Sequence, residues 1–116
     1  MDYISRVARL LNECSDQGLG QKEMADKLGI ASKNYISMIS GKNKNTTSPL
    51  PLARIPSLVE LCGLSPKQGL ELVFLRAKCH PDNPTAFDTA TMACIMSWTR
   101  TVLAERETAK EVFHGE

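Results

Sequence analysis

The chain has 116 residues, of which 42% are hydrophobic and 23% charged, and a formal net charge of +1 at pH 7. This length and composition support a folded core without disulfides or metals and exclude extensive disorder. The charge is unevenly distributed, since positions 27 to 59 hold no acidic residue but several basic ones: Lys27, Lys33, Lys42, Lys44 and Arg54. A local basic surface favours contact with phosphate even on a nearly neutral protein.

The spacing of the cysteines and the hydropathy pattern further restrict the class of protein. The cysteines at 14, 62, 79 and 94 have no zinc-like spacing, and the adjacent Cys79 and His80 lack the third, orienting group of a nucleophilic site. No apolar run of about 18 residues and no leader-like signal occurs. We therefore expect a cytoplasmic protein with reduced thiols that is not an enzyme. We also expect it to bind no metal, cofactor or small-molecule ligand and not to associate with a membrane.

The first two predicted helices are short and amphipathic. One begins behind an N-cap at Asp2 and runs to about Cys14, with its apolar positions at Ile4, Val7, Ala8, Leu10 and Leu11. Turn formers follow, with Gly18 suited to the left-handed residue that ends a helix. The second helix, about 21 to 28, ends at Gly29 and carries on one face Met24, Ala25 and Leu28.

A third helix is predicted between an N-cap at Ser32 and a stop at Gly41. A polar loop of lysines, asparagines and threonines then extends to Pro51. A fourth helix follows, from about Leu52 or Pro56, and ends at Cys62 and Gly63.

A fifth helix begins with the cap Ser65-Pro66, runs to about Lys78 and is expected to be largely buried, because it holds Leu70, Leu72, Val73, Phe74 and Ala77. Prolines at 81 and 84 then divide the chain into a domain at 1–80 and a C-terminal element at 81–116. No strand-like alternation occurs, so the predicted fold class is all-α.

The C-terminal element reads as one long helix from Phe87 to about Lys110, without Gly or Pro. Its apolar residues form two neighbouring stripes. One consists of Phe87, Ala90, Cys94, Trp98 and Val102, and the other of Met92, Ile95, Met96, Thr99 and Leu103. If one stripe packs on the preceding helices, the other needs a partner. The predicted dimer contacts are Phe87, Met92, Ile95, Met96, Trp98, Val102 and Leu103.

From residue 1 to about 78, the chain resembles the lambda-repressor-like, Cro-type family of helix-turn-helix domains. The matching residues are Gln21, Met24-Ala25, Leu28-Gly29-Ile30 and Tyr35-Ile36-Ser37-x-Ile39. The resemblance implies a five-helix domain in which the second and third helices form the DNA-reading unit. The loop after Gly41 departs from the family, since it is longer and more polar than the usual connection.

The register of the third helix has two interpretations. Counting from Gln21 without a gap directs Tyr35 and Met38 into the core, whereas the family pattern inserts one residue in the turn and buries Ile36 and Ile39. We prefer the second register, because it does not leave Ile36 facing phosphate.

A major groove about 12 Å wide admits an α-helix whose N-terminal side chains reach base edges. In the preferred register we expect base contacts from Ser32, Lys33, Asn34, Ser37 and Met38. Phosphate contacts are expected at the start of the second helix and in the loop, from Gln21, Lys22, Lys42, Asn43 and Lys44.

Two functions are compatible with these features. The first is a transcriptional regulator, of the phage or mobile-element repressor type, that binds a palindromic operator in double-stranded DNA as a homodimer through the last helix. The alternative is an antitoxin or anti-regulator whose last helix grips a different protein. An exposed apolar stripe on that helix supports both equally.

Overall fold

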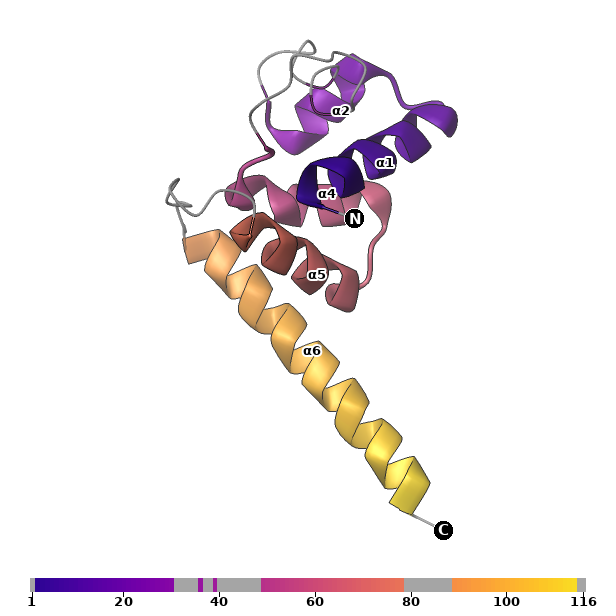
Figure 1. Ribbon diagram of the computed structural model, residues 1–116, viewed down its shortest axis with the longest axis vertical. Coiled ribbons are helices and arrows are strands. Elements are labelled where there is room, and N and C mark those ends of the chain that lie inside the picture. Colours follow the sequence, from indigo (N-terminus) through magenta and orange to yellow (C-terminus); the bar gives the residue numbers. More distant parts are fainter. Residues whose placement is uncertain (1, 31–35, 37–38, 40–48, 79–88, 115–116) are drawn as a thin grey trace.

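The computed structural model describes residues 2–30, 36, 39, 49–78 and 89–114, with side chains given as far as residue 108. Within these residues the chain is all-α, as predicted, and no strand occurs. The continuous elements are α1 (Tyr3–Asp16), α2 (Gln21–Leu28), the 3-10 helix η1 (Leu52–Arg54), α4 (Ile55–Cys62), α5 (Pro66–Ala77) and α6 (Thr89–His114). In Figure 1, α1, α2, α4 and α5 form a compact unit from which α6 extends.

The predicted helix ends follow from local chemistry and are largely confirmed. The Asp2 carboxylate accepts a hydrogen bond from the Ser5 backbone N–H at 2.8 Å and so caps α1. Gly29 and Gly63 end α2 and α4 with left-handed φ values of 71° and 63°, which L side chains rarely adopt. Ser65 caps α5 in a capping box with Gln68.

The core lies between α1, α2, α4 and the helical residues Ile36 and Ile39. The predicted inner face of α2 is confirmed, since Met24, Ala25 and Leu28 are all buried. The face of α1 is rotated from the predicted one: Tyr3 and Cys14 are buried, whereas Ile4 and Ala8 are only half-buried. The core residues of this unit are Tyr3, Val7, Leu10, Leu11, Cys14, Met24, Ala25, Leu28, Ile36, Ile39, Leu50, Leu52, Ile55, Leu58, Val59 and Leu72.

The expectation that α5 is largely buried is wrong. Its buried residues are Gly69, Leu72 and Arg76, while Phe74 is 67% exposed. Positions 69, 72 and 76 are three and four residues apart and share one face, and position 74 falls on the other side of the helix. The unit therefore covers only one face of α5, and the opposite face is exposed even where it holds an apolar residue such as Phe74.

The last helix, α6, packs against α5 and α4 near its start. It begins at Thr89 and continues to His114, beyond the predicted end, because nothing between 110 and 114 breaks a helix. Its inner side holds Thr91, which is buried, together with the half-buried Cys94, Ile95, Trp98 and Val102. Ala90, which the sequence places in one stripe with Cys94, Trp98 and Val102, is exposed. Within the described residues, none of the helices combines the length and apolarity needed to cross a membrane.

Candidate nucleic-acid interface

The predicted reading unit is attached to the core through two isoleucines. Ile36 is fully buried and Ile39 is 3% exposed, as the preferred register requires. Because they are three residues apart in helical conformation, both occupy one face. Tyr35 and Met38, the inward residues of the other register, lie outside the described residues. The burial of Ile36 and Ile39 therefore agrees with the preferred register.

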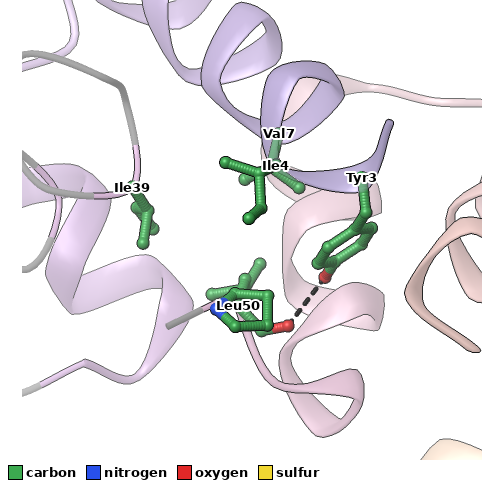
Figure 2. A pocket seen from close by; sticks show the side chains of 6 residues that line it. Tyr3, Ile4, Val7, Ile39 and Leu50 are labelled. Carbon is green, nitrogen blue, oxygen red and sulfur yellow. Dashed lines mark hydrogen bonds between the residues drawn. The ribbon is translucent and has the colours of Figure 1, made fainter. Parts of the chain in front are cut away.

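Ile39 meets the start of α1 across a small apolar hollow of about 10 Å³ (Figure 2). The side chains of Ile4, Val7, Tyr3 and Leu50 surround the hollow with it, and Pro49 completes the lining. Residues on either side of the stretch from 40 to 48 therefore pack against the start of α1. This contact fixes the positions of Ile39 and Leu50 relative to α1.

Leu50 is held in place by its carbonyl oxygen, which accepts two hydrogen bonds. Tyr3 donates its hydroxyl at 2.8 Å from α1, as Figure 2 shows, and Arg76 donates Nε at 3.1 Å from α5. The Arg76 guanidinium also lies 5.9 Å from the centre of the Tyr3 ring, within cation–π range. One backbone carbonyl thus joins α1, α5 and the segment that follows the loop.

Arg76 has a structural role that sequence reasoning missed. It is 5% exposed, and its Nη1 finds no hydrogen-bond acceptor among the described residues. A buried guanidinium cannot contact a solvent-facing phosphate, so Arg76 does not belong to a DNA-facing surface. No local signal predicted its burial, because its partners Tyr3 and Leu50 are remote in the sequence.

The start of α2 presents the part of the predicted phosphate site that the structure describes. Gly20 occupies the N-cap position and provides no side-chain hydrogen bond to the first turn. Gln21 is half-buried there and Lys22 is exposed. Unpaired N–H groups and the helix dipole favour an anion at such an end, although the exposed Glu23 in the same turn opposes this potential.

Two described basic residues of the acid-free stretch, Lys27 and Arg54, lie around the opposite end of α2. Lys27 lines an open groove of about 370 Å³ together with Ser57, Glu60 and Leu61 of α4. Arg54 lies beside Gly29, with Nη1 2.8 Å from the position of a β-carbon on that glycine. Because Glu60 shares the groove with Lys27, this corner is less basic than the acid-free sequence predicted.

Most of the predicted DNA contacts are not tested by the structure. All the base-reading residues, Ser32, Lys33, Asn34, Ser37 and Met38, lie outside the described residues. The same holds for the loop residues Lys42, Asn43 and Lys44. Of the ten predicted contacts, only Gln21 and Lys22 are placed, and both stand at the start of α2.

The predicted dimer residues separate into two groups. Met92, Met96 and Leu103 are 41%, 48% and 52% exposed, whereas Ile95, Trp98 and Val102 are half-buried. The Trp98 ring packs against Gly69 of its own chain, with Cε3 and Cζ3 3.0 Å from the position of a β-carbon there. Phe87 lies outside the described residues. Among the described side chains of α6, the exposed large apolar ones are therefore Met92, Met96 and Leu103, which we call the outer stripe.

No group of three or more His, Cys, Asp or Glu side chains within the described part of the chain is arranged to hold a metal ion. Comparisons of the chain with protein-family models, with curated proteins and with solved structures found no match. The function is therefore inferred from the residues of this chain alone.

Proposed function

We propose that this protein is a sequence-specific, double-stranded-DNA-binding transcriptional regulator with a lambda-repressor-like helix-turn-helix. The observation that carries the proposal is the joint burial of Ile36 and Ile39 after a helix that ends at a left-handed Gly29. Two short helical segments that share a core in this way are what a helix-turn-helix needs to support a reading helix. The motif Tyr35-Ile36-Ser37-x-Ile39 supplies the same spacing in the sequence.

In this proposal Ile36 and Ile39 belong to the core, so the residues that contact DNA are the polar ones around them. Asn34 pairs with adenine N6 and N7, Lys33 donates to guanine O6 and N7, and Met38 touches a thymine methyl. Ser32 and Ser37 complete the base-contacting set. Phosphates are held by the first turn of α2, with Gln21 and Lys22, and by Lys42, Asn43 and Lys44 of the loop.

The outer stripe supports assembly as a homodimer. Met92, Met96 and Leu103 are four and seven residues apart, so they project within about 40° of one another around α6. A twofold dimer places two reading helices about 34 Å apart and reads a palindrome with half-sites one turn apart. A cytoplasmic repressor of the phage or mobile-element type is the biological role that this architecture fits.

Selection of bound fragments from a random pool of double-stranded DNA tests the proposal. The expected result is enrichment of one palindromic sequence with half-sites about 10 base pairs apart. Binding without any sequence enrichment, at an affinity that depends only on salt, would show that the chain is no sequence reader.

A second candidate function is favoured by the same exposed apolar residues of α6. In it, the outer stripe grips a different protein, as in an antitoxin or anti-regulator. The double variant Met96→Ser with Leu103→Ser discriminates, because it spares the packing of Trp98 on α5. Loss of self-association and of operator affinity together supports the regulator. An unchanged monomeric state in both chains, with loss of a heterologous partner, supports the interaction module.

A further inference from the structure

Two cysteine thiols from remote parts of the sequence meet in the interior. The Sγ atoms of Cys14 and Cys62 lie 3.4 Å apart and share a hydrogen bond, and neither is in a disulfide. Cys14 belongs to the last turn of α1 and Cys62 is the last residue of α4. Neither thiol has a part in the proposed DNA contacts or in the outer stripe.

We propose that Cys14 and Cys62 form a paired oxidation site, at which a peroxide produces an intramolecular disulfide between the end of α1 and the end of α4. The thiols face each other across an existing helix contact, so a shift of little more than 1 Å brings the sulfurs to the bonding distance of about 2.05 Å. The residues enclosed by the new bond include α2, Ile36 and Ile39. The cross-link thus spans the whole predicted reading unit.

The reaction proceeds in two balanced steps with hydrogen peroxide as the oxidant. The sulfur of Cys62, the more exposed of the two, attacks one peroxide oxygen; the O–O bond breaks, a sulfenic acid forms and the other oxygen leaves as water with the thiol proton. The sulfur of Cys14 then attacks the oxidised sulfur and displaces its oxygen as a second water. Two sulfurs are oxidised and two peroxide oxygens are reduced.

The environment of the two thiols makes this site a slowly formed, stabilising disulfide and not a rapid redox sensor. Burial, followed by the hydrogen bond shared with Cys14, raises the pKa of Cys62 to about 12, so little thiolate exists at neutral pH. A thiol of high pKa is also a poor leaving group, so the disulfide, once formed, is reduced slowly by other thiols. The small movement required leaves the helices in place.

The experiment uses the full chain, treated with hydrogen peroxide, denatured, alkylated and mapped by mass spectrometry without reduction. We expect a peptide that joins Cys14 to Cys62, and a melting temperature raised by about 5 °C or more that dithiothreitol returns to its starting value. The matched control Cys94→Ala should retain both effects, because Cys94 lies on α6. Cys62→Ala should lose both.

Mapping of the unaltered chain decides the matter even if a variant folds poorly. Disulfides that involve only Cys79 or Cys94, with Cys14 and Cys62 alkylated, would overturn the proposal. A Cys14–Cys62 disulfide without a rise in melting temperature would overturn the proposed stabilising role of this disulfide. Neither result depends on DNA binding, so the proposed function stands or falls separately.

Discussion

Trp98 of α6 rests directly on Gly69 of α5, with ring atoms Cε3 and Cζ3 each 3.0 Å from the place where a β-carbon on residue 69 would lie. Gly69 is buried, and the absence of a side chain there leaves room for the indole. A glycine inside a helix costs about 1 kcal/mol relative to alanine, and here the cost is offset by this contact. The pair is therefore a principal attachment of α6 to the rest of the chain.

Replacing Gly69 by valine should displace the indole. The branched side chain overlaps the Trp98 ring, so we expect a loss of stability of about 1–3 kcal/mol and a red shift of tryptophan fluorescence. Trp98 is the single tryptophan, so its emission reports this contact alone. Glu71→Val, at an exposed position of the same helix, should leave the emission unchanged. An unshifted spectrum for Gly69→Val would mean that the ring does not lie on α5.

Tyr3→Phe should cost about 1 kcal/mol of unfolding free energy in urea denaturation. The change removes the hydroxyl that donates to the Leu50 carbonyl at 2.8 Å but keeps the buried ring. Arg76 continues to donate to the same oxygen, so the carbonyl is not left unpaired. A loss above about 3 kcal/mol would indicate that Arg76 does not compensate.

Base readout and phosphate contact are separable by two substitutions. Asn34→Ala should weaken operator binding by about 1–3 kcal/mol and relax the preference at one base pair. Lys44→Ala should weaken all sequences alike and reduce the salt slope by about one unit. Binding curves over several salt concentrations and single-base variants measure both effects. Identical effects of the two changes on every sequence would refute the assignment.

If the proposed homodimer forms through the outer stripe, Met96→Glu should convert it to a monomer, because the substitution places a charge in that stripe. We expect sedimentation as a monomer and operator binding weakened by about a hundredfold, since two half-sites are no longer held together. Trp98 fluorescence should not change. Phe74→Glu is the matched control: it alters an apolar residue on α5 that is more exposed than Met96, and it should leave self-association intact. A dimer that survives Met96→Glu places the interface elsewhere.

Alkylation of Cys62 by iodoacetamide should depend on pH in a way that distinguishes folded from unfolded chain. The folded pKa is raised to about 12 from an ordinary 9.0, so the native rate should rise about tenfold per pH unit well above pH 9, where the unfolded rate levels off. The raised pKa also means that stability is full below pH 9 and declines as the pH rises toward 12. Peptide mass analysis follows Cys62 itself. Equal profiles in both states would contradict burial of the thiol.

The features that the sequence predicted correctly are those with local causes. The cap at Asp2, the glycine stops at Gly29 and Gly63, and the cap at Ser65 each depend on residues within one helical turn. The burial of Met24 and its neighbours on α2 follows from the helical period in the same way. Of the candidate DNA site, the burial of Ile36 and Ile39 was predicted, and the predicted contacting residues other than Gln21 and Lys22 lie outside the described residues.

The features that were missed have partners far along the chain. Tyr3 is buried because its hydroxyl meets Leu50, a residue 47 positions away. Arg76 is buried for the same reason, and no helical period signals a buried cation. Phe74 illustrates the converse: an apolar residue is exposed where none of the described elements covers its face. The division of α6 into an attached and a free stripe likewise depended on the place of α5.

The hollow shared by Ile39 and Leu50 has a consequence for how this protein can be altered. Ile39 and Leu50, which flank the stretch from 40 to 48, both line a hollow at the start of α1, so the chain is held in the folded unit on both sides of that stretch. Doubling a loop costs only about 0.6 kcal/mol of closure entropy. Residues can therefore be inserted or exchanged there, and a fluorescent label introduced, while the folded unit keeps its stability.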